Sequence, residues 1–303
     1  MERTLQKKIS SRDDRIINCI VYLFCTIVLV LTVYPLVFVV SASISEPKYV
    51  ALGEVLLLPK GLTFEGYQTV LAYDEIWVGY KNTIFYTLLG TLINLLVTLP
   101  CAYALTREEL IGRHVFTKLF TFTMLFNGGL IPLYLTVKSL GQLDTIWAVM
   151  LPVAMSAYNL IITKTYFQNS IPKELQEAAM IDGCRTTTLF IRIIVPLSMP
   201  IIAVIGLYYA VMHWNSYFNA MIYLSDRKLY PLQLFLRSIL LENMMANLEG
   251  ADPDAAEAII RQIQVRESMK YGIVVISSLP MLMLYPLIQR YFVKGVMVGA
   301  VKG

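Results

Sequence analysis

A run of aromatic and amide side chains near residue 210 carries the residue types best suited to noncovalent binding. Amides donate and accept hydrogen bonds, and aromatic rings pack against the apolar faces of ring-shaped ligands. We therefore predict a path for a neutral hydroxylated ligand formed by Tyr208, His213, Trp214, Asn215, Tyr217 and Asn219, with Asn127 and Asn159 as further candidates. Structural roles stay open, because Trp and Tyr gather at membrane–water interfaces and buried Asn often bonds a neighbouring helix.

A second polar segment, residues 171–192, has the pattern of a docking helix rather than of a catalytic site. Ser170 is a candidate helix cap, and Pro172 suits a first helical turn. Gly183 can adopt the left-handed conformation that ends a helix. Helical spacing puts the small and apolar residues Leu175, Ala178 and Ala179 on one face, and leaves Lys173, Glu174, Glu177 and Asp182 in water.

The sequence lacks the motifs of the common catalytic and metal sites. It contains no G-x-x-x-x-G-K-[ST] phosphate loop, no G-x-S-x-G elbow and no H-E-x-x-H pair. The four cysteines and two histidines form no C-x-x-C or mixed cluster, so we predict no metal site. We expect no enzyme activity in this chain and no cofactor bound to it.

The composition is that of a protein embedded in a lipid bilayer. Of the 303 residues, 57% are hydrophobic and 15% are charged, whereas soluble domains carry about 25% charged residues. The excess of apolar side chains must face lipid. The net charge of +4 is small and dispersed, which argues against a nucleic-acid partner.

Apolar runs and charged loops alternate along the chain and position both polar segments. Each run is long enough to cross a bilayer, and together they predict an all-α polytopic membrane protein with six transmembrane helices. The predicted spans are Ile16–Val40, Asn82–Leu105, Leu119–Val137, Thr145–Thr163, Pro200–Tyr217 and Tyr271–Gln289.

The basic residues of the loops predict the orientation of these spans. Lys and Arg concentrate on the cytoplasmic side of membrane proteins, which places residues 1–15, 171–192 and 290–303 inside and the region 218–270 outside. Both termini are then cytoplasmic, and residues 1–303 form a single transmembrane domain. No Asp, Glu, Lys or Arg lies within the predicted spans, which disfavours a proton-coupled carrier without excluding an ATP-independent carrier or channel.

Residues Glu177, Ala178, Ala179, Gly183, Ile193, Val195 and Pro196 resemble the EAA loop of ABC-importer permeases, with Val195 where leucine is usual. The resemblance implies the type I importer fold and a cytoplasmic helix that docks on an ATPase subunit. It assigns the docking to Glu174, Glu177, Ala178, Ala179, Asp182 and Gly183, and a carboxylate such as Glu177 could bind an arginine of that partner.

The segments FNGGLIPLY, HWNSYFNA and YPLQLFLR and the tail QRYFVKGVMVGAVKG are similar to the carbohydrate-uptake branch of these permeases. This similarity implies a subunit of a bacterial inner-membrane importer for sugars or oligosaccharides; a permease for a non-sugar solute is the alternative. The implied partners are a second permease, two ATPase subunits that bind ATP and Mg, and an external solute-binding protein. Lys302 and Gly303 are implied to touch the ATPase.

Overall fold

The structure is a computed structural model that describes residues 12–244, 264–265, 269–284 and 286. In this part of the chain, helices dominate, and the extended pairing is limited to one isolated bridge between Ser45 and Leu62. The chain divides into two compact units, residues 1–72 with 245–276 and residues 73–244 with 277–303. Each unit is described by itself below, within its described residues.

The first unit contains α1 (Arg12–Ser43), α2 (Pro47–Ala51) and α3 (Glu65–Leu71). Residues Asp14–Ser43 of α1 are long and apolar enough to cross a membrane, which agrees with the predicted first span. Side chains fix the chain that follows α1: Ser41 Oγ donates to the Leu57 carbonyl over 2.6 Å, and Tyr67 Oη donates to Ser43 Oγ over 2.8 Å.

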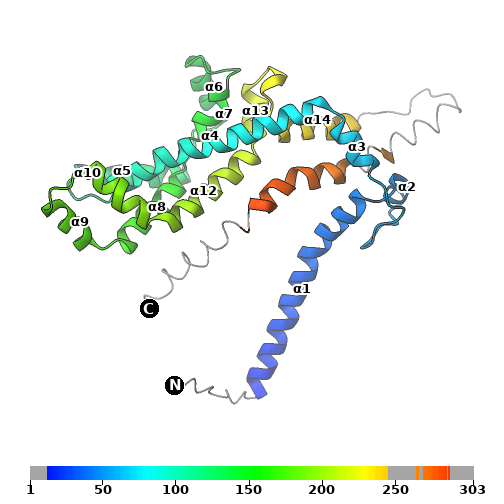
Figure 1. Cartoon of the computed structure of the whole chain (residues 1–303), viewed down its shortest axis with the longest axis horizontal. Coiled ribbons are helices and arrows are strands. Elements are labelled where there is room, and N and C mark those ends of the chain that lie inside the picture. Colours follow the sequence, from blue (N-terminus) through cyan, green and yellow to red (C-terminus); the bar gives the residue numbers. More distant parts are fainter. Residues whose placement is uncertain (1–11, 245–263, 266–268, 285, 287–303) are drawn as a thin grey trace. The chain divides into compact units, whose positions relative to one another are not determined.

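The second unit is built around the 31-residue helix α4 (Asp74–Ala104). Figure 1 shows α4 alongside α12 (Met199–Trp214), and α8 (Ala157–Ser170) packs against both. The shared core of these helices consists of buried apolar side chains such as Leu99, Leu160, Ile201 and Ile205. The remaining helices of this unit are α5 (Arg113–Leu125), α6 (Leu130–Ser139), α7 (Ile146–Met150), η1 (Leu151–Val153), α9 (Lys173–Ile181), α10 (Thr186–Leu189), η2 (Phe190–Ile194), α11 (Val195–Leu197), α13 (Phe218–Tyr223), η3 (Arg227–Leu229) and α14 (Leu232–Met244).

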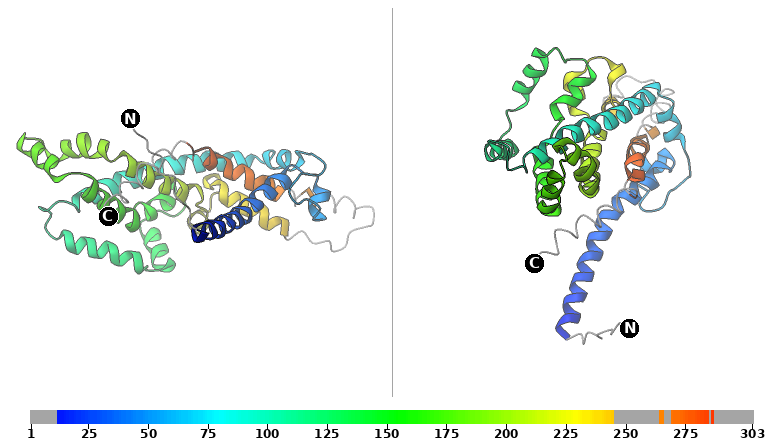
Figure 2. Two further views of the ribbon diagram at one scale, coloured as in Figure 1. Left: turned by 90° about the horizontal axis from the view of Figure 1, so that it is seen from below. Right: turned by 60° about the vertical axis from the view of Figure 1, so that its left-hand side comes forward.

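Two of the predicted spans, the third and the fourth, are bent rather than straight, and a further bend lies just before the fifth. The bends are 117° between α5 and α6, 49° between Ile146–Val153 and α8, and 81° between Thr186–Leu197 and α12 (Figure 2). Gly129 explains the first, because its φ of +87° cannot continue a right-handed helix and Asn127 Oδ1 accepts its N–H over 2.9 Å. The helix of the sixth predicted span covers Met269–Leu284; the end of that span lies outside the described residues.

Two buried polar clusters join α4, α12 and the segment before α8. Asn94 Nδ2 donates to the Val153 carbonyl over 2.6 Å, and Asn94 Oδ1 lies 2.6 Å from His213 Nε2. One turn away, Tyr209 Oη accepts the Ser156 N–H over 3.1 Å and lies 2.8 Å from Thr98 Oγ1. Because a polar group buried in hydrocarbon is costly without a partner, these contacts fix the packing of the three segments.

Candidate functional site

The predicted docking helix exists as α9, but it begins differently from the expectation. Pro172 occupies the cap position with φ −58° and ψ 137°, no side chain caps the helix, and Ser170 is the last residue of α8. The proposed Ser170 cap was therefore wrong. The reason is the proline, which keeps the preceding residue Ile171 out of the helical region (φ −111°, ψ 115°) and so separates the two helices.

The end of α9 confirms the predicted glycine turn. Gly183 has φ +79°, its N–H bonds the Met180 carbonyl over 3.0 Å, and the Cys184 N–H bonds the Ala179 carbonyl over 2.9 Å. This pair of bonds is the Schellman motif. It fixes the angle at which the chain leaves α9 towards α10.

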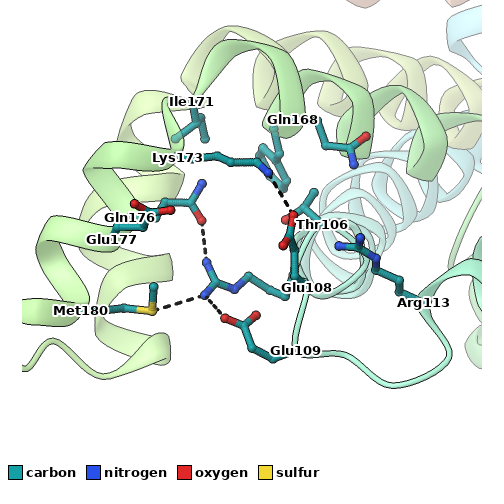
Figure 3. Close-up of a pocket in the computed structure, with 12 residues that line it drawn as sticks. Thr106, Glu108, Glu109, Arg113, Gln168, Ile171, Lys173, Gln176, Glu177 and Met180 are labelled. Atoms are coloured by element: carbon teal, nitrogen blue, oxygen red, sulfur yellow. Dashed lines mark hydrogen bonds and ion pairs between the residues drawn. The ribbon is translucent and has the colours of Figure 1, made fainter.

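The inner face of α9 rests on the loop that follows α4. Arg107 of this loop donates from Nη1 to Gln176 Oε1 over 2.7 Å and from Nη2 to Met180 Sδ over 3.3 Å. Its Nη2 also contacts Glu109 Oε1 at 2.9 Å (Figure 3), and its Cζ lies 5.8 Å from the Tyr103 ring centroid. The Arg107 side chain is only 17% exposed, so one half-buried cation joins α9 to the end of α4.

A second ion pair supports this junction at its rim. Lys173 Nζ lies 2.9 Å from Glu108 Oε1, and the hydrogen bond from Lys173 holds the pKa of the Glu108 carboxyl below its ordinary value. Both side chains are well exposed, and exposed pairs contribute little stability. Arg107 is therefore the main polar anchor of α9.

A cleft of about 250 Å³ separates α9 from this loop. Charges of both signs line it, the cations Arg107, Arg113 and Lys173 and the anions Glu108, Glu109 and Glu177 (Figure 3). The junction therefore holds polar contacts beside open space, rather than a filled apolar core.

The outer face of α9 is free of contacts with the described residues that would bury it. Glu174 and Ala178 are exposed, and Ile181 is 85% exposed, whereas Glu177 is exposed at the edge of this face, where it also lines the cleft. Glu174, Ala178 and Ile181 follow the i, i+4, i+7 spacing of one helical face. Ala179 faces inwards instead and packs on the core of α4 and α12, which separates it from Ala178.

The cleft at the other end of α12 collects part of the predicted ligand path. A space of about 190 Å³ is lined by four predicted residues, His213, Asn215, Tyr217 and Asn219, together with Val153, Met212, Ser216 and Phe218. Its amide, hydroxyl and aromatic groups are the types that bind polyhydroxylated rings. The structure therefore brings these four residues together.

The other predicted path residues lie elsewhere. Trp214 is 4% exposed and donates its indole N–H to the Ser277 carbonyl over 2.9 Å, which is a structural contact. Tyr208 is on the exposed surface of α12, and Asn159 is buried beside its helix cap Ser156. Asn127 supports the turn between α5 and α6. None of these four lines the cleft.

Several interacting residues were not singled out from the sequence. Arg107, Glu108 and Asn94 are not among the candidates that the sequence indicates. A hint for Asn94 was available, since an amide within a predicted span needs a partner. Five segments lie outside the described residues: 1–11, 245–263, 266–268, 285 and 287–303. They include Lys302 and Gly303 and parts of the predicted external region.

Comparison with known proteins identifies the class of protein to which the chain belongs. The family described as "Binding-protein-dependent transport system inner membrane component" matches residues 76–298. The chain is 38% identical over 290 residues to the polygalacturonan/rhamnogalacturonan transport system permease protein YtcP of Bacillus subtilis (strain 168), covering 96% of this chain and 99% of that protein. It is 36% identical over 294 residues to protein LplC of the same organism, covering 97% of each.

A solved structure is similar over nearly the whole fold. The crystal structure of a bacterial ABC transporter involved in the import of the acidic polysaccharide alginate contains a chain with a TM-score of 0.83 and 34% identity, covering 93% of this chain and 98% of that one. The predicted permease fold is thereby confirmed. The chain belongs to the family of binding-protein-dependent transport system inner membrane components, which are integral permease proteins of the bacterial plasma membrane.

Proposed function

We propose that this chain is one permease subunit of an ATP-driven importer for oligosaccharides, and that α9 couples it to an ATPase. The observation that carries the proposal is the two-sided character of α9. Its inner face is anchored by Arg107, its outer face exposes Glu174, Ala178 and the apolar Ile181, and Glu177 is exposed between the two faces at the cleft. A small, acidic and partly apolar face on a fixed helix suits a protein partner that supplies arginine.

The proposed complex contains a second permease, two ATPase subunits that hold ATP and Mg, and an external solute-binding protein. Both termini of this chain are proposed to be cytoplasmic, with Lys302 and Gly303 reaching the ATPase. Asp182 and Gly183 set the exit from α9, so a push on α9 reaches α12 through α10, η2 and α11.

The proposed mechanism is a change between two packings of the spans. Closure of the ATPase dimer moves α9, and the 81° bend before α12 gives the chain a place to hinge. ATP must favour one packing by a few kcal/mol for the shift to be nearly complete. The sugar then passes the cleft lined by His213, Asn215, Tyr217 and Asn219.

The sugar class is supported by the chemistry of this cleft and by the names of the relatives. YtcP is named for polygalacturonan and rhamnogalacturonan, and the solved transporter imports alginate. Amide and aromatic groups in the cleft can hydrogen-bond hydroxyls and stack on sugar rings.

Charge reversal at Glu177 tests the coupling. We expect Glu177→Arg to lower ATP-driven uptake at least tenfold, or to release the ATPase, because an arginine on the partner would then face a like charge. Sugar binding by the isolated binding protein should not change. Uptake and co-purification of the ATPase are measured in proteoliposomes and detergent.

Glu75→Arg is the matched control, because Glu75 is exposed in the first turn of α4, at the opposite end of this helix from the Arg107 loop. Its uptake should stay within about twofold of the wild type. Normal uptake and assembly by Glu177→Arg would refute the coupling role of α9.

A further inference from the structure

Arg237 places a cation beside Tyr217, one of the residues that line the cleft at the end of α12. It lies on α14, its side chain is exposed, and its Cζ is 5.7 Å from the ring centroid of Tyr217. Tyr217 lines the cleft. The guanidinium also donates from Nη1 to Met221 Sδ over 2.6 Å, and a thioether is a weak acceptor.

The backbone that leads to Arg237 is held firmly by α4. Thr83 Oγ1 accepts the Leu232 N–H over 2.8 Å, and Asn82 Nδ2 donates to the Tyr230 carbonyl over 2.9 Å. Gly79 lets α14 approach closely, since a Cβ there would lie 2.9 Å from Leu232 Cα. The start of α14 is thus preorganised, so the position of Arg237 beside the cleft does not depend on a mobile loop.

The guanidinium has unused hydrogen-bonding capacity. Ion pairs within the described residues involve Lys60, Arg107 and Lys173 as cations, so no described carboxylate pairs with Arg237. The eight residues that line the cleft include no Asp or Glu. A guanidinium presents five N–H donors in a planar fork that matches a carboxylate in a bidentate pair.

We infer that Arg237 binds a carboxylate of the transported ligand, so that the cleft accepts acidic, uronate-bearing oligosaccharides. This inference rests on the proposed function. The amide and aromatic groups of the cleft contact the ring and its hydroxyls, and Arg237 adds selection for the anionic substituent. A neutral sugar can form the contacts with the amide and aromatic groups but not the ion pair with Arg237.

Paired probes separate the carboxylate from the rest of the sugar. Trigalacturonate and its fully methyl-esterified form have the same rings and length, but only the first is anionic. Uptake is measured with the complete transporter in proteoliposomes at saturating binding protein. The binding protein is the same for every variant. Any preference of the binding protein for one probe therefore cancels when the uptake rate of a variant is divided by that of the wild type.

We expect Arg237→Gln to lower trigalacturonate uptake about tenfold, because it removes the charge-assisted hydrogen bonds to the carboxylate and leaves the contacts to the ring. Uptake of the ester should change less than about twofold. Arg237→Lys should recover part of the acid uptake. Arg227→Gln removes an exposed cation from the neighbouring η3, and it should affect neither probe if the effect is local.

Equal losses for both probes in Arg237→Gln, or equal losses of acid uptake in the two glutamine variants, would overturn the inference while the importer proposal stands. The inference would also be overturned if the wild-type transporter imported the methyl ester but not trigalacturonate. Uptake of neither probe would overturn the oligosaccharide substrate together with this inference, whereas Glu177→Arg reports separately on ATPase coupling.

Discussion

Replacement of Arg107 by methionine should loosen α9 while leaving its outer face intact. Methionine keeps an unbranched chain of similar reach beside Tyr103, but it lacks the N–H groups that bind Gln176 and Met180. The variant therefore removes the polar anchor of α9 without touching Glu177. Transport coupling should suffer even though the docking surface is unchanged.

The expected loss follows from the contacts of the guanidinium. A hydrogen bond to a charged group contributes about 1.5–3 kcal/mol, and the 2.7 Å contact with Gln176 is the strongest that Arg107 forms with α9. Gln176 is half-buried and can bind water once the partner is gone, so the lower value applies. About 1.5 kcal/mol reduces the ratio of docked to undocked α9 roughly tenfold.

Two measurements report on this change. Hydrogen exchange of the α9 amides should accelerate about tenfold, in proportion to the undocked population. The reconstituted transporter should hydrolyse severalfold more ATP per sugar imported, because an undocked α9 moves without moving α4. Glu109→Gln is the control, since it removes only an exposed carboxylate from the same guanidinium and should cost at most about 1 kcal/mol.

A double-mutant cycle with Gln176→Met decides whether the contact itself is responsible. The losses of Arg107→Met and Gln176→Met should be clearly less than additive, because either change removes the same hydrogen bond. Additive losses, or unchanged amide exchange in Arg107→Met, would refute the reasoning.

Two glycine substitutions test the packing and the exit of α9. Gly90→Ala would place a Cβ 2.5 Å from the His213 ring. This overpacking should cost about 1–3 kcal/mol and lower the Tm of the complex by several degrees. The control Gly206→Ala, whose Cβ would meet its nearest neighbour at 3.8 Å, should leave the Tm nearly unchanged. A larger loss of Tm in Gly206→Ala than in Gly90→Ala would contradict the close approach of His213 to Gly90. Gly183→Ala should reduce uptake more than Gly183→Asn, because asparagine tolerates the left-handed φ of +79° better than alanine, which costs about 1–2 kcal/mol there; equal uptake by both would show that this turn is not needed.

The sequence was sufficient to predict the membrane class, the helical fold and the position of α9. Long uncharged runs can only be spans, and a glycine after an amphipathic stretch is a strong stop signal, as Gly183 shows. The bend of 117° between α5 and α6 was not predictable in size. Asn127, Gly128 and Gly129 mark a break, but the direction of the next helix depends on tertiary packing.

The partners of the polar residues were also beyond the sequence, because they are far apart along the chain. Arg107 and Gln176 are separated by 69 positions, and Asn94 and His213 by 119. Residue type indicates that such groups need partners, but only the fold selects which ones meet. Residue type also could not show that Trp214 lies away from the cleft while His213 and Asn215 line it. Adjacent residues of a helix point in different directions, and only the packing of the helix decides which of them reach the cleft.

The contacts of α4 at its two ends suggest why coupling and binding can be linked within one chain. Near its beginning, α4 holds the backbone of the η3–α14 segment through Asn82 and Thr83. Directly after its end, Arg107 holds α9. A movement of α9 therefore acts on α4 through Arg107 and on α12 through the continuous chain, and these two helices meet at Asn94 and His213. Because His213 also lines the cleft, a shift between α4 and α12 must alter the cleft that we propose as part of the sugar path.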